Sequence, residues 1–422
     1  MGRQILVIGG GGREHALAWA LAGAASVDAV VTAPGNPGTS DLGRNEPVEA
    51  TDPVAVADLA ERLGADLVVV GPEAPLVAGV VDELLRREIP AFGPTAAAAR
   101  IEGSKAFAKE IMEAAGVPTG GAVATTSVEE AAAALERFGP PYVVKADGLA
   151  AGKGVRICAT LDEARGAVDD ALVQGIFGAA GARVVIEEFL AGPERSVFGV
   201  CDGTDVVLLE SAQDYKRARD GDAGPNTGGM GAYSPVPGFA LADVGHLEDL
   251  LFRPVLRELA ARGTPYRGLL YAGLVDTADG PKLLEFNARF GDPESQAILP
   301  RLASDLGDLL SAAAVGSVGD VEVAWRDEAA VTVVLASGGY PGSYPTGVPI
   351  AGVDDARSLA GVEVFHAGTR EHDGRLVTDG GRVLAVTALG QGVADARSRA
   401  YEAAGRIAFD GAHRRSDIAA GL

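Results

Sequence analysis

A short stretch that reads LLEFNAR places a carboxylate, an amide and a guanidinium at alternate positions of a predicted strand. Side chains of a strand alternate between its two faces, so Glu285, Asn287 and Arg289 share one face. Leu284 and Phe286 are then expected to face the core. Carboxylate and amide oxygens are hard ligands that suit Mg²⁺ on nucleotide phosphates, and Arg289 can contact a phosphoryl group or a substrate carboxylate. The alternative is a strand with a solvated face and an ordinary salt bridge.

The loop Gly148–Gly154 reads GLAAGKG and differs from a P-loop. It has three residues between its outer glycines instead of four, and Gly154 stands where a Ser or Thr would bind magnesium. It also joins two expected strands, as a flexible hairpin that can close over a triphosphate. Lys105, Lys145 and Lys153 would neutralise the phosphates. The alternative is a mobile hairpin with solvated lysines.

The N-terminal turn Gly9–Gly12 follows an apolar run and precedes a helical pattern. The dinucleotide fingerprint fails here, because Glu14 or His15 stands at its third glycine. The next strand, ending near Thr32, lacks the acidic residue that would hold a ribose. A phosphate can still bind the free N–H groups of a helix N-terminus, and the Asn36–Gly38 turn should lie at the same sheet edge. A tight turn without a ligand is the alternative.

A second glycine-rich loop, Gly224–Gly231, follows the polar residues Asp214, Lys216 and Arg217. Long structureless loops inside a compact chain are more often functional than idle. The five histidines form no HExxH motif, and no Ser/His/Asp arrangement is recognisable. We therefore expect chemistry that relies on positioning and charge rather than on a protein nucleophile.

Apolar runs that alternate with helical patterns predict a parallel α/β domain over residues 1–102. Loops at the carboxyl ends of its strands would form a ligand crevice. Helices are expected over residues 13–24 and 78–87. The expected strands are Ile5–Ile8, Val27–Thr32, Leu67–Val70 and Pro90–Phe92.

The next region has the pattern of an α+β lobe over residues 118–190. Ser127-x-x-Glu130 and Thr160-x-x-Glu163 are capping boxes, each opening a helix. The expected strands of this lobe are Tyr142–Lys145, Val155–Cys158 and Val184–Glu187.

Two antiparallel hairpins and a small C-terminal domain are expected in the rest of the chain. One hairpin covers Val197–Leu209, and the other joins Leu269–Val275 to Lys282–Asn287. Helices are expected over Ser104–Ala115 and Ala394–Ala408.

The composition excludes several classes of protein. The 422 residues are 47% hydrophobic and 22% charged, which is a globular mixture. A net charge of −22 argues against a nucleic-acid binder and against a polybasic membrane anchor. Cys158 and Cys201 are too few for a disulfide framework, and no run reaches about 20 apolar residues. We expect a soluble cytoplasmic protein, either a monomer or a dimer.

Taken together, the motifs resemble those of the ATP-grasp ligases, and within them the phosphoribosylamine–glycine ligase (glycinamide ribonucleotide synthetase) family. The likeness covers nearly the whole chain, and its RFGDPE string is very specific. The strings that carry it are VIGGGGREHALAW, APGNPGT, VVVGPEAPL, SKAFAKEIMEAAGVPT, YVVKADGLAAGKGV, GPNTGGMGAYSP and LEFNARFGDPESQ.

The resemblance implies an α/β and α+β multidomain fold. It comprises a parallel N-terminal (pre-ATP-grasp) domain over residues 1–102 on the phosphoribosylamine side, an ATP-grasp domain with a small lid lobe over 103–325, and a small C-terminal domain over 326–422. The implied reaction joins glycine to 5-phosphoribosylamine at the expense of ATP, in de novo purine (IMP) biosynthesis. The products are glycinamide ribonucleotide, ADP and phosphate, formed through glycyl phosphate. Mg²⁺ or Mn²⁺ would be the cofactor.

The resemblance also implies roles for individual residues. Glu285 and Asn287 would bind the metal, Arg289 the phosphoryl group or the glycine carboxylate, and Asp214 and Asp292 the glycine ammonium. ATP would be held by Lys105, Lys145, Gly152, Lys153, Gly154, the adenine-pocket stretch Glu187, Glu188, Phe189 and Leu190, and by Glu194 at the ribose. The phosphoribosylamine side would use Gly10, Gly11, Gly12, Asn36 and Gly38 for the 5-phosphate, Glu73 for a ribose hydroxyl, and Gly229.

Two positions depart from the family pattern. Tyr215 stands where the family usually has His, so no proton transfer is assigned to it. Gly273 occupies the place of a third acidic metal ligand found in other ATP-grasp enzymes.

Three other functions remain open at this point. A purine-pathway carboxylase or formate-using transformylase of the same fold would replace glycine by bicarbonate or formate. A nicotinamide-dependent oxidoreductase is motivated by the first glycine turn. A non-catalytic sensor would bind ATP without turnover.

Overall fold

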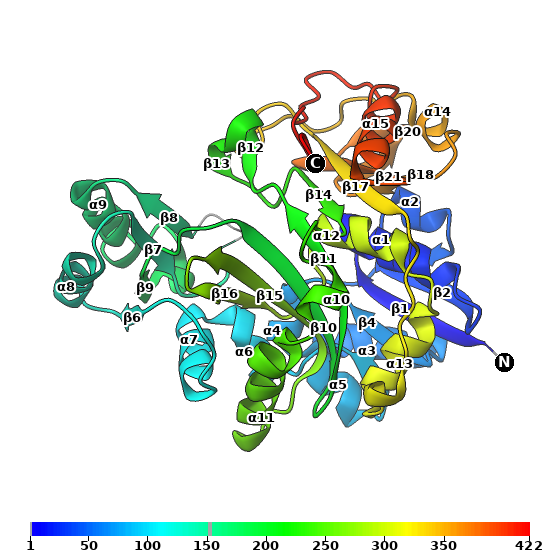
Figure 1. The fold of residues 1–422 in the computed structure, drawn as a ribbon. Coiled ribbons are helices and arrows are strands. Elements are labelled where there is room, and N and C mark those ends of the chain that lie inside the picture. Colours follow the sequence, from blue (N-terminus) through cyan, green and yellow to red (C-terminus); the bar gives the residue numbers. More distant parts are fainter. Residues whose placement is uncertain (1, 151–153) are drawn as a thin grey trace.

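The computed structural model describes residues 2–150 and 154–422. Figure 1 shows the N-terminal domain and the C-terminal region on one side of the molecule and a lobe with α8 and α9 projecting on the other. No helix in the described part of the chain is long and apolar enough to cross a bilayer.

The N-terminal domain is a five-stranded parallel sheet in the order β3-β2-β1-β4-β5. Residues Ile5 to Ile8 are fully buried because helices cover both faces, which confirms the predicted parallel α/β arrangement. The predicted helix over 78–87 is two helices, broken at Gly79, whose φ of +90° favours glycine. The elements are β1 (Arg3–Gly9), α1 (Gly12–Ala22), β2 (Val27–Pro34), α2 (Pro37–Ser40), β3 (Arg44–Asn45), α3 (Pro53–Leu63), β4 (Leu67–Val70), α4 (Glu73–Ala78), α5 (Val80–Arg86), β5 (Ala91–Phe92) and α6 (Ala96–Gly103).

The projecting lobe is a four-stranded antiparallel sheet in the order β6-β9-β7-β8, covered by α8 and α9. It has a hydrophobic cluster of its own, so it can move as a unit. The box at Thr160 is confirmed, whereas at Ser127 only half forms, because the Glu130 carboxylate accepts from Thr125 Oγ1 at 2.5 Å. The elements are β6 (Ala122–Thr125), α8 (Val128–Phe138), β7 (Tyr142–Ala146), β8 (Val155–Cys158), α9 (Leu161–Leu172) and β9 (Val184–Glu187).

The largest sheet has eight strands in the order β16-β15-β10-β11-β14-β17-β21-β18. It confirms both predicted hairpins and continues through β14 into β17, so the ATP-grasp region and the C-terminal region share one sheet. Its strands are β10 (Glu194–Asp202), β11 (Val206–Asp214), β14 (Gly231–Ser234), β15 (Arg267–Thr277), β16 (Gly280–Asn287), β17 (Ala329–Ala336), β18 (Val362–His366) and β21 (Arg382–Gly390).

Helices and two small hairpins complete the structure. The predicted C-terminal helix ends at Ala404, four residues earlier than expected. The helices are α7 (Lys105–Ala114), α10 (Leu241–Val244), α11 (Arg253–Ala261), α12 (Glu294–Ile298), α13 (Leu306–Val315), α14 (Val353–Arg357) and α15 (Val393–Ala404), and the hairpin strands are β12 (Arg217–Arg219), β13 (Ala223–Asn226), β19 (Thr369–His372) and β20 (Arg375–Thr378).

A bulge in β16 changes the expected alternation of its side chains. Gly273 of β15 pairs with Glu285, but the next residue of β15, Leu274, pairs with Leu283. Leu284 is therefore the extra residue of the bulge. Leu283 and Phe286 enter the core, while Leu284 lines a cavity. The prediction that Leu284 faces the core was wrong because simple alternation does not anticipate an inserted residue.

Because of the bulge, we predict that alanine substitutions at two neighbouring positions lower the free energy of unfolding by different amounts. Leu283→Ala should lower the free energy of unfolding by about 2–5 kcal/mol, because Leu283 is fully buried. Leu284→Ala should cost at most about 1 kcal/mol, because the side chain borders a cavity. Urea unfolding followed by circular dichroism measures both. Equal losses would contradict this assignment of the bulge.

Candidate active site

A cavity of about 1240 Å³ lies where the lobe, the large sheet and the N-terminal domain meet. The C-terminal region reaches it through Tyr340, Tyr344 and Arg382. Of the predicted site residues, those that line it are Glu73, Lys105, Lys145, Gly154, Glu187, Glu188, Phe189, Leu190, Glu194, Asp214, Glu285, Asn287, Arg289 and Asp292. Gly152 and Lys153 lie outside the described residues. Gly10, Gly11, Gly12, Asn36, Gly38 and Gly229 do not belong to the lining.

Glu285 is the carboxylate around which the cations of the cavity gather. Burial raises its pKa, but the charges of Lys216 and Lys145, followed by Lys105 and Arg289, lower it by more, so the group stays ionised. Asn287 lies two residues further along β16 and also faces the cavity. The strand thus presents a charged and a neutral oxygen donor side by side.

Gly273 leaves room opposite this pair. A Cβ atom added there would lie 3.4 Å from Glu285 Cγ. Among residues 2–150 and 154–422, no group of three or more Asp, Glu, His or Cys side chains has the arrangement of a metal site. The oxygens of Glu285 and Asn287 fit a hard divalent ion that takes its remaining ligands from substrate and water.

Two lysines share one carboxylate beneath the lobe. Lys145 Nζ lies 3.0 Å and Lys109 Nζ 3.4 Å from the same oxygen of Glu187. Burial lowers the pKa of Lys145, but the charges of Glu187 and Glu285 and the hydrogen bond to Glu187 together outweigh it, so the net direction is upward. Lys109 was not anticipated, although it lies one helical turn after Lys105 and so on the same side of α7. Glu187 thus holds the lysines with its side chain.

The base of the glycine-rich loop is fixed by Asp147. Its carboxylate accepts from the Ala106 amide at 2.7 Å and pairs with Arg183 Nη2 at 2.6 Å. Lys105 Nζ donates to the carbonyl of Gly148 at 3.3 Å. The loop therefore leaves β7 from an anchored point beside α7, and Lys105 faces the cavity from there.

The segment after β9 connects the lobe to the large sheet. The Glu188 amide donates to the Gly121 carbonyl at 2.9 Å, and the Gly121 amide donates to the Glu188 carboxylate at 3.0 Å. Phe189 remains 38% exposed and faces the cavity. Glu194, at the start of β10, pairs with Lys216 at 2.6 Å.

Arg289 lies between two carboxylates from the N-terminal domain and its connecting helix. Its Nη2 is 3.0 Å from Glu102 and its Nε is 3.3 Å from Glu73. Burial lowers the pKa of the guanidinium, but these carboxylates raise it more, so the net shift is upward. Arg13 joins the group, 3.9 Å from Glu73, and donates to the Phe290 carbonyl at 3.2 Å.

The two N-terminal turns are held together by their own side chains. Asn36 Nδ2 donates to the carbonyls of Gly10 and His366, and Asn36 Oδ1 accepts from the amides of Gly38 and Thr39. The Asn36 side chain and the Gly38 N–H are thus engaged within the turn. The structure does not present them to the cavity as phosphate donors.

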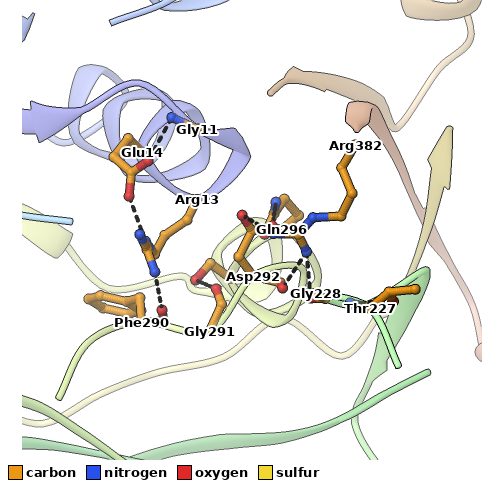
Figure 2. A network of polar contacts seen from close by, with 12 residues as sticks. Gly11, Arg13, Glu14, Thr227, Gly228, Phe290, Gly291, Asp292, Gln296 and Arg382 are labelled. Carbon is orange, nitrogen blue, oxygen red and sulfur yellow. Dashed lines mark hydrogen bonds and ion pairs between the residues drawn. The ribbon is translucent and has the colours of Figure 1, made fainter. Parts of the chain in front are cut away.

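Glu14 explains why the first turn is so rich in glycine. Its carboxylate accepts from the Gly11 amide at 2.7 Å and pairs with Arg13. A Cβ atom on Gly9 or on Gly71 would lie 2.6 Å or less from a Glu14 side-chain atom. Figure 2 shows Glu14 and Arg13 linking this turn to Phe290.

Asp292 is held by an arginine from the C-terminal region. Arg382 Nη2 lies 2.9 Å from the Asp292 carboxylate, and its Nη1 donates to the carbonyls of Asp292 and Gly228, each at 2.6 Å. Gln296 donates to the other carboxylate oxygen at 2.8 Å. Figure 2 shows Arg382 reaching both loops at once. Gly229, next to Gly228, packs against Pro293, where a Cβ atom would clash at 2.4 Å.

Asp214 and Glu294 supply further negative charge to the cavity. The pKa of Asp214 is raised to about 7, because burial and the charges of Glu294 and Glu194 raise it by more than Lys216 lowers it. Glu294 is buried and accepts from the Tyr271 hydroxyl at 2.7 Å. Both carboxylates face the cavity.

Comparison with known proteins identifies the family. Models of three domains of phosphoribosylglycinamide synthetase match the chain: the N domain over residues 3–102, the ATP-grasp (A) domain over 103–295 and the C domain over 330–421. The chain belongs to the phosphoribosylglycinamide synthetase family. Phosphoribosylamine–glycine ligase from Streptomyces coelicolor is 53% identical and that from Rhizobium meliloti is 49% identical; the matches cover 99% of both chains in the first case, and 98% of this chain and 97% of the relative in the second.

Solved structures agree with this assignment. The crystal structure of phosphoribosylamine–glycine ligase from Thermotoga maritima matches with a TM-score of 0.84 and 36% identity, over 98% of this chain and 100% of that one. The biotin carboxylase domain of a Hydrogenobacter thermophilus carboxylase, in complex with MgADP and bicarbonate, shares the fold at 17% identity and a TM-score of 0.74, over 98% of this chain and 92% of that one. The synthetase is thus a ligase of the ATP-grasp fold, as the motifs implied, and the oxidoreductase alternative is wrong.

Sequence reasoning missed the residues that hold the synthetase site together from a distance. Glu102 pairs with Arg289 across 187 sequence positions, and Arg382 pairs with Asp292 across 90. Neither Glu102 nor Arg382 belongs to a glycine-rich loop or a functional motif recognised in the sequence. Glu294 ends the RFGDPE string, but no role was predicted for it from the sequence.

The raised pKa of Asp214 predicts a pH-dependent stability change. The folded-state pKa of about 7 exceeds the ordinary value of 3.8, so the native protein is destabilised by ionisation above pH 7 and not below about pH 4. Asp214→Asn should therefore raise the thermal midpoint at pH 8, and the gain should shrink toward pH 5. Differential scanning calorimetry at both pH values measures this.

Asp276→Asn provides the control, because this exposed carboxylate lies on β15 of the same sheet. It should leave the midpoint nearly unchanged at either pH. The burial argument would be contradicted if Asp214→Asn raised the thermal midpoint equally at pH 5 and pH 8, or if it lowered the midpoint at pH 8.

Proposed function

We propose that the protein catalyses the ATP-dependent ligation of glycine to 5-phosphoribosylamine through a glycyl phosphate intermediate, in purine biosynthesis. The observation that carries the proposal is the pair Glu285 and Asn287, which faces one cavity together with Lys105, Lys145 and Arg289. Such a cavity can accept a nucleotide triphosphate with its counter-ion. The family and the named relatives supply the choice of substrates.

The first step requires the glycine carboxylate and the γ-phosphoryl group to meet in line. A carboxylate oxygen attacks the γ-phosphorus, the bond to the β–γ bridging oxygen breaks, and ADP leaves. We assign Lys105, Lys145 and the loop around Lys153 to the phosphates, and Arg289 to the transferring phosphoryl group or the glycine carboxylate. Charge neutralisation and orientation are the contributions these residues can make.

The second step forms the amide bond. The amine nitrogen of phosphoribosylamine attacks the carbonyl carbon of glycyl phosphate, the carbon–oxygen bond to phosphate breaks, and the nitrogen loses a proton. We assign the glycine ammonium to Asp214 with Asp292, of which Asp214 is the less engaged. Closure of the lobe would exclude water from the acyl phosphate.

The nucleotide and the sugar phosphate would occupy opposite ends of the cavity. We propose that Glu187, Glu188, Phe189 and Leu190 line the adenine pocket and that Glu194 reaches the ribose, since this stretch borders the cavity beneath the lobe. The 5-phosphate itself would bind beyond this lining, at the start of α1 formed by Gly10–Gly12, where Glu14 accepts from the Gly11 amide in this structure. Glu73 would contact a ribose hydroxyl of phosphoribosylamine.

Glu285 and Asn287 would hold a divalent ion, Mg²⁺ or Mn²⁺. When bound, this ion neutralises phosphate charge and orients the γ-phosphoryl group. We propose that the protein works as a monomer or a dimer. Because Cys158 and Cys201 are free thiols, we place it in a reducing cytoplasm.

ADP release provides the direct test of substrate choice. With ATP and magnesium, release should require glycine and should rise when phosphoribosylamine is generated in situ from ribose 5-phosphate and ammonia. Coupled spectrophotometric detection of ADP measures it. Release that depends on bicarbonate or formate and ignores glycine would instead identify a related carboxylase or transformylase.

Glu285 provides the test of the metal role. Glu285→Ala should lower glycine-dependent ADP release by a factor of about 1000 at saturating ATP. The variant would lack a ligand of the divalent ion, so the charge of the ATP phosphates would be poorly neutralised. Asp279→Ala, at the exposed turn of the same hairpin, should retain normal turnover. Near-normal turnover of Glu285→Ala would contradict the metal role. ATP binding without turnover by the native protein would indicate a sensor.

A further inference from the structure

The hairpin formed by β12 and β13, residues 217–226, borders the active-site cavity but lies outside the large sheet. Its two strands pair only with each other. Arg217, Asp222 and Asn226 nevertheless line the cavity. A two-stranded hairpin is marginally stable by itself, so its position must be fixed by other parts of the chain.

The C-terminal segment, residues 413–419, provides this support through Arg415. The arginine is 1% exposed, and its Nη1 donates to the Asp222 carboxylate at 2.7 Å and to the Arg217 carbonyl at 3.1 Å. Its Nε and Nη2 pair with the two oxygens of Asp417, each at 2.7 Å. These bonds hold the Asp417 pKa at about 2, so the pair is ionised under assay conditions. One guanidinium thus joins the C-terminal segment to the first strand of the hairpin and to its turn.

Three neighbouring hydrogen bonds also join the C-terminal segment to the hairpin. The Ser416 amide donates to Asp220 at 2.8 Å, and the Gly221 amide donates to Asp417 at 2.8 Å. His413 Nε2 lies 2.7 Å from the Ala218 carbonyl. In Figure 1 the hairpin projects toward the C-terminal region. The contacts extend from Ala218 to Asp222, so they hold the turn of the hairpin as well as its first strand.

Tyr215 completes the arrangement at the base of the hairpin. Its ring centroid lies 4.9 Å from the Arg415 guanidinium carbon, and its hydroxyl accepts from the Ala419 amide at 2.8 Å. Its own amide and carbonyl bond to Gly231 and Met230, on the far side of the glycine-rich loop. This chain therefore uses Tyr215, where the family pattern has His, to attach the C-terminal segment.

We propose that Arg415 is a positioning residue for the ligation, which acts by holding the 217–226 hairpin over the cavity; this rests on the proposed function. The hairpin follows directly after Asp214 and Lys216, and Lys216 lines the cavity and pairs with Glu194 at 2.6 Å. A shift of the hairpin would therefore move a cation away from the phosphates. Arg415 itself does not belong to the cavity lining.

The test compares Arg415→Ala with Arg414→Ala in glycine-dependent ADP release. Arg415→Ala should lower kcat by about tenfold or more per folded molecule and change KM for ATP by less than about threefold, because the hairpin is hydrogen-bonded to the C-terminal segment and, among the described residues, shares no hydrogen bond with Glu187–Leu190. Arg415→Lys should recover only part of kcat, since a lysine lacks the fork that serves several acceptors. Arg414 donates to Ala404 within the C-terminal region, so Arg414→Ala should be normal.

Amide hydrogen exchange supplies a readout that does not depend on turnover. Arg415→Ala should accelerate exchange in residues 217–226 and leave β18 and β21 as slow as in the native protein. If Arg415→Ala does not fold, Tyr215→Phe, which removes only the hydroxyl, should show the same pattern with a smaller change in kcat.

The outcomes separate the two proposals. Native protein without glycine-dependent ADP release would overturn the proposed function, and exchange would still report on the hairpin. Native activity together with unchanged kcat and unchanged exchange in the variants would overturn only the role of Arg415. A fall in thermal midpoint alone, with normal kcat per folded molecule, would also overturn it.

Discussion

Lys145 and Lys109 approach the same oxygen of Glu187, and the same pairing of cation with carboxylate recurs around the cavity. A site that receives a triphosphate needs more cations than a protein interior tolerates, because a buried charge without a partner is strongly unfavourable. Carboxylates meet this constraint before substrate arrives: Glu285 faces several lysines, Glu102 and Glu73 hold Arg289, and Asp292 holds Arg382. Incoming phosphates can then take over partners that are already oriented, and little reorganisation is required at the moment of reaction.

The same pairs connect parts of the chain that are distant in sequence. Arg289, just after β16, reaches Glu73 on α4, and Arg382 reaches from β21 to the loop after β16. The glycine-rich turns permit these approaches: Gly9 and Gly71 leave room for Glu14, and Gly229 leaves room for Pro293. The active site is therefore assembled from loops in which glycines allow close approach, and ion pairs fix the distances between these loops. This suits an enzyme whose chemistry is transfer between two substrates and needs no protein nucleophile.

Local patterns in the sequence predicted the local elements well. The strand Leu67–Val70 and the cap at Thr160 are found where expected, because hydrophobic runs and capping residues act within a few positions. The lining residues Glu285, Asn287 and Lys145 were also identified, as they lie in or beside recognisable motifs. Three features were not predictable in this way. The bulge at Leu284 inserts a residue that strand alternation cannot reveal. Asn36 was predicted to bind phosphate, but its side chain is hydrogen-bonded to the Gly38 amide in its own turn and to the His366 carbonyl. Glu102 and Arg382 act through partners far along the chain.

The strongly acidic composition and the anionic substrates are compatible because the relevant distances are short. At physiological ionic strength the Debye length is about 8 Å, so carboxylates on the outer surface are largely screened from a ligand inside the cavity. Within it, the cations on α7, on β7 and just after β16 lie on surfaces of lower dielectric, where each charge acts more strongly. The net charge of the chain therefore does not determine whether its cavity binds anions or cations. The arrangement of Lys105, Lys145 and Arg289 around one carboxylate–amide pair favours phosphate there, even though the chain as a whole repels it.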